Sequence, residues 1–392
     1  MHNLFWALLI LFTTAVFLRI DWIYYLVYVI GGVWVFSHWW IRRSLDHLSV
    51  ERKLSLRAFT GEKVDATIQL RNRSWLPLPW LQIQEQVPLD LKDQLEYQNV
   101  LSVAGRSQVD YHYKLWCKKR GYYSIGPLVL RTGDLFGFAS ASWQEVATVN
   151  MTVYPQVVPL QELGLSSRLP FGSLSSPHRL FDDPTRIAGV RDYISGDSMR
   201  SIHWKASARE DTLLVKKFQP AIALNVSIVL DLNRNAYPFA AVGPSEWAIV
   251  IAASFAAYVT QQRQPIGLFS NGLDPRSEEV AAPLAARNGE GQLMEILTLL
   301  ARIQMHEYEH DLATWLPQQL ANMAWGTTLI LVTPALDAQS LWALHNTYRR
   351  GSKVFVLICA PQADFEDVRA QGKRLGVAVE RTLWEKDLQL KI

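Results

Sequence analysis

Three residues in the C-terminal half have the types and spacing of a zinc hydrolase. His306, Glu307 and His310 match the pattern H-E-x-x-H. On a helix, the two histidines would lie one turn apart and bind Zn²⁺, with Glu307 as the general base. However, the preceding helical periodicity ends near Ile303, and Asp311 has the type of an N-cap for the next helix. The pattern therefore falls on a connector, for which a solvated loop is the favoured interpretation.

The densest constellation of polar residues lies between positions 191 and 209, and it includes several charged ones. Gly196 suits a turn, and Asp197 suits a helix N-cap because its carboxylate can accept backbone N–H bonds. Arg191, Arg200 and Arg209 can each form bidentate pairs with carboxylates or phosphates. Two interpretations stay open for this segment. One is a docking surface or anion site, and the other is an internal charge network, which is the commoner use of such residues.

Polar residues also follow the first long apolar run of the C-terminal half. Asp231, Asn233 and Asn235 come directly after the run 222–230. If this run is a strand of a doubly wound sheet, ligands would sit beyond its carboxyl end, at the topological switch point. The stretch is therefore a candidate binding site, and the alternative is a turn that Asp231 caps.

Hydrophobic periodicity predicts the elements that must position these residues. Between 48 and 154, apolar and polar residues alternate, as from Val64 to Leu70, which predicts antiparallel strands in a β-sandwich-like domain. From 221 to 392, strands that are apolar throughout alternate with helices, which predicts a doubly wound α/β domain around a parallel sheet. Residues 155–220 form a linker that contains the charged segment.

The charged segment carries a long sequence motif. It reads R-x-Y-x-x-G-D-x-x-R-x-I-x-W-x-x-S-A-R and resembles the signature of the bacterial domain of unknown function 58 family. The upstream segment RGYYSIGPLVLRTGDLFGF, Arg120 to Phe138, is similar to a second motif of that family. We assign these positions to binding or interaction: Arg191, Tyr193, Gly196, Asp197, Arg200, Trp204, Ser207 and Arg209. Trp204 is expected to be a buried anchor.

The resemblance implies a membrane anchor, a β-sandwich-like region, a von Willebrand factor A-like domain and a MoxR-type AAA+ ATPase as partner. Domains similar to von Willebrand factor A place D-x-S-x-S after the first strand, where the oxygens bind Mg²⁺. Asp231 matches, whereas Asn233 and Asn235 replace the serines. A second carboxylate is missing beside Thr333 unless Asp337 reaches the site. We therefore expect no cofactor, and Mg²⁺ at this degenerate site is the alternative.

Two apolar runs at the N-terminus predict a transmembrane hairpin within residues 1–43. Residues 4–18 and 22–41 carry no Asp, Glu, Lys or Arg, and a spanning helix needs about 20 apolar residues. Basic residues such as Arg42 and Arg43 follow the second run, which favours cytoplasmic N- and C-termini. The predicted location is the bacterial inner (plasma) membrane, with two passes through the lipid bilayer.

Composition excludes several classes of protein. The 39 Lys and Arg nearly balance the 36 Asp and Glu and are interleaved with them, which argues against a nucleic-acid binder. The two cysteines cannot build a disulfide framework, and the chain has no phosphate-binding loop of an ATPase. We therefore predict a membrane-anchored, cytoplasm-facing interaction or assembly protein without catalytic residues. The alternative is a membrane-associated metal-dependent hydrolase that uses the H-E-x-x-H residues, and the oligomeric state is left open.

Overall fold

A computed structural model gives the fold. The residues that it describes are 2–18, 21–94, 97–135, 137, 140–145, 147–160, 182–194, 199–210, 212–220, 225–237, 242–321, 323 and 326–382. The chain separates into two compact units, Met1–Gln156 and Val157–Ile392. Each unit is described by itself below.

The first unit begins with two helices, α1 (His2–Leu18) and α2 (Asp21–Leu45). Helix α1 has 17 residues and is therefore only about 26 Å long at about 1.5 Å per residue. Helix α2 is longer, but Tyr, Trp, Gly, Ser and His interrupt its aliphatic residues. Among the described residues, no helix combines the length and the apolarity that a membrane crossing requires. The predicted transmembrane hairpin, and with it the two-pass inner-membrane location, is therefore wrong.

Helix α2 packs on the β-structure that follows it. The indole Nε1 of Trp40 donates a hydrogen bond to the carbonyl oxygen of Pro77 at 2.8 Å. Ile41 is buried on the same helix, whereas Phe17 of α1 and Tyr25 of α2 are exposed. The helices therefore carry large apolar side chains on surfaces that the described part of the chain leaves uncovered.

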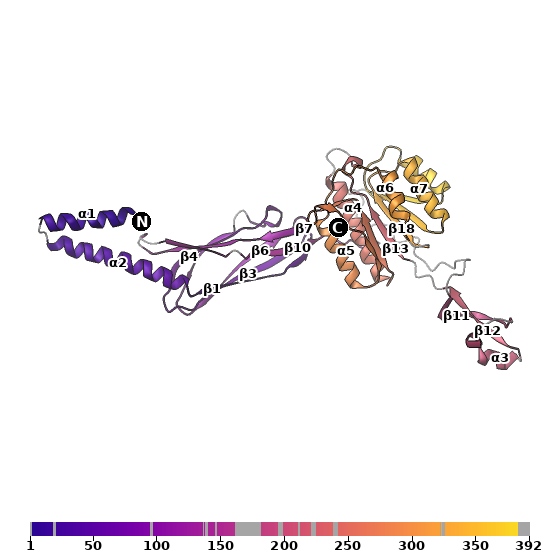
Figure 1. Ribbon diagram of the computed structural model, residues 1–392, viewed down its shortest axis with the longest axis horizontal. Coiled ribbons are helices and arrows are strands. Elements are labelled where there is room, and N and C mark those ends of the chain that lie inside the picture. Colours follow the sequence, from indigo (N-terminus) through magenta and orange to yellow (C-terminus); the bar gives the residue numbers. More distant parts are fainter. Residues whose placement is uncertain are drawn as a thin grey trace. The chain divides into compact units, whose positions relative to one another are not determined.

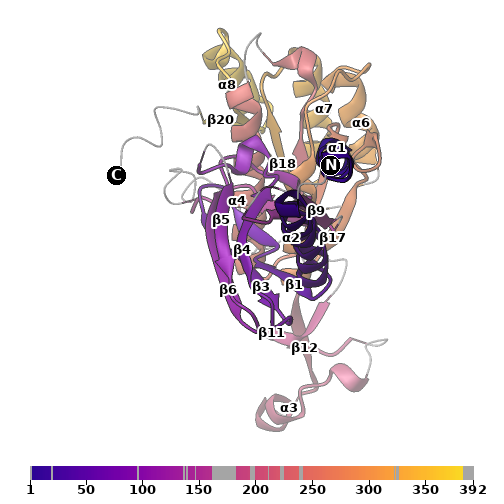
Figure 2. The same cartoon turned by 90° about the vertical axis from the view of Figure 1, so that its left-hand side faces the viewer.

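The strands of the first unit form antiparallel ladders around one apolar core. They are β1 (Leu48–Leu54), β2 (Arg57–Phe59), β3 (Lys63–Asn72), β4 (Leu78–Glu85), β5 (Gln98–Val103), β6 (Gln108–Trp116), β7 (Gly121–Ile125), β8 (Leu128–Gly133), β9 (Ser140–Glu145) and β10 (Val149–Tyr154), with the short helix η1 (Leu89–Leu91) after β4. The sheet orders are β1-β3-β6, β5-β4-β8-β9 and β2-β10-β7, in which only the short β2 pairs in parallel. Figure 2 shows β1, β3 and β6 side by side.

The period-two pattern explains which side chains form that core. Along β3, Val64, Ala66, Ile68 and Leu70 are all buried, and the residues between them are more exposed. The expected alternation is therefore confirmed for this strand. Residues of β3, β4, β6, β8 and β10 share the core, so all three sheets contribute to it.

The second unit contains a small arm and an α/β body. The arm consists of β11 (Asp182–Asp192), η2 (Met199–Ser201), α3 (Trp204–Glu210) and β12 (Leu214–Pro220). Strands β11 and β12 pair antiparallel, and α3 contacts β12 (Figure 1). We call the described residues from 182 to 220 the signature arm.

The α/β body is built on a sheet in the order β17-β14-β13-β18-β19-β20. Its strands are β13 (Val226–Leu230), β14 (Ile266–Ser270), β17 (Leu284–Arg287), β18 (Thr328–Thr333), β19 (Lys353–Ile358) and β20 (Ala378–Arg381). All neighbours pair in parallel except β17, which runs antiparallel to β14. A small hairpin of β15 (Leu273–Asp274) and β16 (Glu279–Val280) follows β14.

Helices cover both faces of this sheet. They are α4 (Val242–Gln261), α5 (Glu290–Arg302), α6 (Leu312–Ala321), α7 (Ala338–Arg349) and α8 (Phe365–Arg374), and the short η3 (Arg234–Ala236) follows β13. Val229, Leu331 and Val356 pack with α6, α7 and α8 in one core cluster. Helix α4 contacts β13 and β18 from the other face, next to α5 (Figure 1). The sheet is thus buried on both sides, which explains why β13 is apolar throughout.

Candidate functional site

The carboxyl ends of four parallel strands bring polar side chains together in the α/β body. Asp231 follows β13, Asn271 follows β14, Thr333 ends β18 and Cys359 follows β19. Because β14 and β18 lie on opposite sides of β13, this edge is the topological switch point of the sheet. We call these residues, together with Asn233 and Tyr237, the strand-end cluster.

Asp231 is the centre of the cluster. Its Oδ1 accepts hydrogen bonds from Nδ2 of Asn271 at 2.7 Å and from the backbone N–H of Asn233 at 3.1 Å. Its Oδ2 accepts one from the hydroxyl of Thr333 at 3.0 Å. Burial raises the pKa of Asp231 above its usual range, and these hydrogen bonds counteract part of that rise. The carboxyl group is therefore committed to internal bonds rather than presented to solvent.

Tyr237 and Cys359 are the remaining members of the cluster. The hydroxyl of Tyr237 donates to the backbone oxygen of Asp231 at 2.7 Å and lies 4.0 Å from Sγ of Cys359. Burial is the main cause that raises the pKa of the Cys359 thiol to about 12. Since the thiolate is the nucleophilic form, this thiol is not set up for covalent catalysis.

Asn233 ties the H-E-x-x-H segment to the cluster. Its Oδ1 accepts from the backbone N–H of Tyr308, and its Nδ2 donates to the carbonyl oxygen of His310. Asn233 also forms an isolated parallel bridge with His306. The segment is therefore irregular and extended, as expected of a connector, and the helical spacing that would bring His306 and His310 to one zinc ion is not formed.

In this segment the ring of Tyr308 contacts both histidine rings. The ring of His306 lies 5.9 Å from that of Tyr308, and the ring of Tyr308 lies 5.7 Å from that of His310. His306 is half-buried, whereas Glu307 and His310 are exposed. Within the described ranges, no group of three His, Cys, Asp or Glu side chains could hold a metal ion.

The donor set at Asp231 does not fit Mg²⁺ either. Mg²⁺ requires near-octahedral oxygen ligands. Oδ1 of Asn233 already accepts the backbone N–H groups of Asn235 and Tyr308, which uses both of its lone pairs. Asn235 is exposed, and Asp337 caps α7 by accepting from the backbone N–H of Ser340. The side chains that the sequence offered as ligands are therefore engaged in hydrogen bonds or point elsewhere.

The signature arm holds the other group of predicted residues. Gly196 and Asp197 lie outside the described residues, and so does the side chain of Arg200, which belongs to η2. Arg191 lies on β11 and donates to the backbone oxygen of Asp192 at 3.1 Å. Tyr193 follows β11, and its backbone N–H donates to the carbonyl oxygen of Leu213 at 2.8 Å.

Helix α3 is fixed to β12 by Ser207. The buried Oγ of Ser207 accepts a hydrogen bond from the backbone N–H of Leu214 at 2.9 Å. The backbone N–H of His203 donates to the carbonyl oxygen of Leu214 at 2.8 Å. Ser207 therefore has a structural role, and Arg209, at the end of α3, is exposed.

Trp204 is not the buried anchor that the sequence suggested. Its side chain is 63% exposed at the start of α3, whereas Ile202 and Val215 form the buried contacts of the arm. Met199 and Ile194 are 65% and 64% exposed. The arm thus presents large apolar side chains outward around a small interior of its own.

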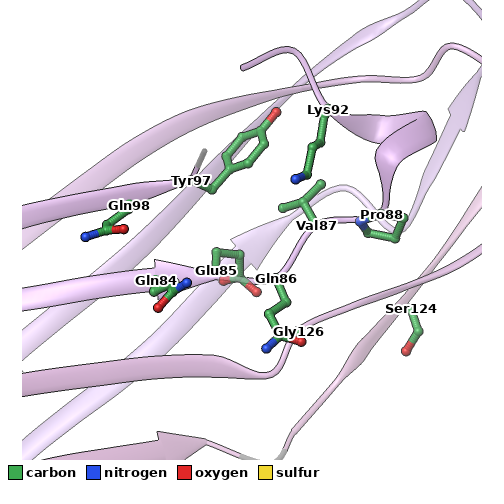
Figure 3. Close-up of a pocket in the computed structure, with 10 residues that line it drawn as sticks. All are labelled: Gln84, Glu85, Gln86, Val87, Pro88, Lys92, Tyr97, Gln98, Ser124 and Gly126. Carbon is green, nitrogen blue, oxygen red and sulfur yellow. The ribbon is translucent and has the colours of Figure 1, made fainter. Parts of the chain in front are cut away.

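The first unit contains a polar recess of about 530 Å³. Figure 3 shows its lining, which includes Gln84, Glu85, Lys92, Tyr97 and Gln98. Nη2 of Arg52 lies 2.9 Å from Oε1 of Glu85, and the side chains of this pair are 4% and 0% exposed. Because this buried ion pair engages the carboxylate, the recess does not offer a free catalytic acid.

Most of the arm and most of the cluster fall within the match to one family model. Residues 189–357 match the sequence model of the family described as "Protein of unknown function DUF58". These residues belong to the DUF58 family. The resemblance inferred from the signature motif is thereby confirmed.

The DUF58 region extends from β11 to β19 and includes Trp204, Asp231, Asn271 and Thr333, but not the first unit. The uncharacterized protein YeaD of Bacillus subtilis (strain 168) is 25% identical over 183 residues, which are 44% of this chain. The chain spans less than half of that relative, because the match covers 44% of its length.

Two solved structures that are similar to this chain each cover about a quarter of it. The CARDB domain of a Pyrococcus furiosus protein, in complex with di-metal ions, is 13% identical and has a TM-score of 0.22, over 28% of this chain and 94% of that domain. A chain of the human complex between zinc 2-glycoprotein and prolactin inducible protein is 8% identical with a TM-score of 0.23, over 27% of this chain and 92% of that one. TM-scores this low do not establish a shared fold.

Sequence reasoning missed several members of the cluster. Asn271 is not among the predicted site residues, although it lies two residues beyond the short apolar run 265–269, much as Asp231 follows its own run. A search for polar residues after every predicted parallel strand would have found it. Cys359 also follows an apolar strand directly, whereas Tyr237 carries no such local signal.

Proposed function

We propose that this protein is an interaction protein whose signature arm docks a MoxR-type AAA+ ATPase. The partner class rests on the resemblance of the signature motif to its family. The observation that carries the proposal is the exposure of Ile194, Met199 and Trp204 on the arm. Exposed apolar side chains of this size are typical of contact surfaces, and tryptophan is among the residues that dominate binding energy at interfaces.

The arm is also built to hold these side chains in place. Its strands pair along β11 and β12, and Ser207 fixes α3 to β12. Lys205 and Arg209, which also belong to α3, are exposed. Transient protein interfaces usually combine large apolar side chains with polar and charged ones.

Affinity capture tests the proposal. The full chain is used as bait in a bacterial extract, and the retained proteins are identified by mass spectrometry. We expect a MoxR-type ATPase to be retained by the wild type and lost with Trp204→Ala. Truncation of a central interface tryptophan costs about 2 kcal/mol or more, which is about 30-fold in affinity.

The matched control is Trp342→Ala, because Trp342 is also exposed, at 57%, but lies on α7. This variant should retain the ATPase like the wild type. Absence of an ATPase from the wild-type eluate, or equal retention by Trp204→Ala, contradicts the proposal.

A further inference from the structure

The strand-end cluster joins two strands through a single side chain. Nδ2 of Asn271 donates to Oδ1 of Asp231 at 2.7 Å, while its Oδ1 accepts the backbone N–H of Leu232 at 2.6 Å. Asn271 is 1% exposed, like Asp231. Both ends of the amide are therefore used to connect the end of β14 to the end of β13.

The remaining bonds extend the connection to β18. Thr333 donates to Oδ2 of Asp231 at 3.0 Å, and the backbone N–H of Asp231 donates to the carbonyl oxygen of Val332 at 2.9 Å. A divalent cation in such a place would neutralise Asp231 and link the strand ends through oxygen ligands. Here, donors from two neighbouring strands supply that link.

We infer that Asn271 takes the place of a divalent cation at Asp231, so that the strand ends are held by hydrogen bonds and need no metal. Its amide N–H₂ occupies the side of Oδ1 on which a cation would bind. The amide is neutral and its oxygen is bonded to Leu232, so Asn271 is a positioning residue and not a cation ligand.

We expect that replacing Nδ2 of Asn271, which donates to Oδ1 of Asp231, with an oxygen atom would create a cation site. Asn271→Asp keeps the shape of the side chain and the acceptor for the N–H of Leu232. It replaces the donor that faces Asp231 with an oxygen, so two buried carboxylates would face each other. Like charges this close repel strongly, and a cation between them relieves the repulsion.

The experiment compares wild type, Asn271→Asp and the control Asn288→Asp, all as full chains. Asn288 is exposed in the same unit, so the control introduces the same charge without a facing carboxylate. Thermal unfolding and calorimetric titration are measured with EDTA, with Mg²⁺ and with Ca²⁺. Wild type and control should not respond to the cations.

For Asn271→Asp we expect low stability in EDTA and recovery with Ca²⁺ or Mg²⁺. At a free cation concentration about 100 times the dissociation constant, the unfolding equilibrium should shift about 100-fold. A folded Asn271→Asp that gains no cation response overturns the inference, and so does a variant that no cation restores to the folded state.

The wild-type titration is a second, independent test. Stoichiometric Mg²⁺ or Ca²⁺ binding by the wild type that Asp231→Asn abolishes overturns the inference. Because neither measurement uses the ATPase, the outcome does not depend on the proposed docking function.

Discussion

The strand-end cluster and the signature arm belong to the same family region but use their side chains in opposite ways. In the cluster, Asp231 and Thr333 are 1% and 0% exposed and bond each other. On the arm, Met199 and Trp204 are 65% and 63% exposed. A buried polar group destabilises the fold unless it is hydrogen-bonded. The cluster's polar residues therefore bond one another and hold the carboxyl ends of the central strands together. Of these two regions, therefore, the arm presents large side chains to solvent and the cluster does not.

The largest expected effect comes from removing the centre of the cluster. Asp231→Ala leaves the amide of Asn271 and the N–H of Asn233 without their acceptor, whereas the hydroxyl of Thr333 keeps the carbonyl oxygen of Ala335. Unsatisfied buried donors cost about 1–3 kcal/mol each, so we expect a loss of about 3 kcal/mol or more in unfolding free energy. Urea unfolding of the full chain, followed in the second unit, measures this loss of unfolding free energy.

The control for that experiment is Asn235→Ala. Asn235 was also a candidate ligand, but its side chain is exposed, so the loss should stay within about 0.5 kcal/mol. If the two variants unfolded at the same urea concentration, the cluster would not be the internal fixation point described above.

A smaller effect is expected for Thr333→Val. The substitution keeps the shape of a fully buried side chain and removes only its hydroxyl, which lies 3.0 Å from Oδ2 of Asp231 and 2.8 Å from the carbonyl oxygen of Ala335. We expect a loss of about 1–2 kcal/mol, again from urea unfolding. No loss would mean that Oδ2 finds another donor and that β18 is not tied through Asp231.

On the arm, Ser207→Ala should act locally. It removes the acceptor for the backbone N–H of Leu214 and should cost about 1 kcal/mol. Because the arm has its own small interior, the effect should appear as faster hydrogen exchange at Leu214, while β13 exchanges as in the wild type. Equal acceleration in β13 would contradict a separate arm.

The smallest effect on stability is expected for Trp204→Ala. The indole is mostly exposed, so its removal should change the unfolding free energy by less than about 0.5 kcal/mol. A large loss of stability would show that Trp204 is an anchor of the fold, as the sequence alone suggested.

Local sequence patterns predicted the strands well. The alternation from Val64 to Leu70 and the apolar runs that became β13, β18 and β19 each encode which faces are buried. The N-terminal apolar runs predicted helices at the right residues, but the prediction that these helices span a membrane was wrong. The runs were judged by their lack of charge, whereas α1 is short and α2 is rich in aromatic and polar residues.

The candidate sites were harder to predict because their geometry depends on distant residues. Asn271 lies 40 positions from Asp231 and Thr333 lies 102, so no local pattern shows that they satisfy its carboxylate. The H-E-x-x-H pattern is local, but the backbone of this segment is extended because His306 forms a β-bridge with the distant Asn233. Trp204 was expected inside because tryptophan is usually buried, and only the structure shows that Ile202 and Val215 fill the arm's interior.

Hydroxyl-radical footprinting with and without a purified MoxR-type ATPase tests whether the exposed side chains of the arm form the docking surface. We expect Met199 and Trp204 to oxidise rapidly in the free chain and several-fold more slowly when the ATPase is added, while the exposed Trp342 does not change. Slow oxidation of Met199 and Trp204 in the free chain, or oxidation that the ATPase leaves unchanged, would rule out this docking surface.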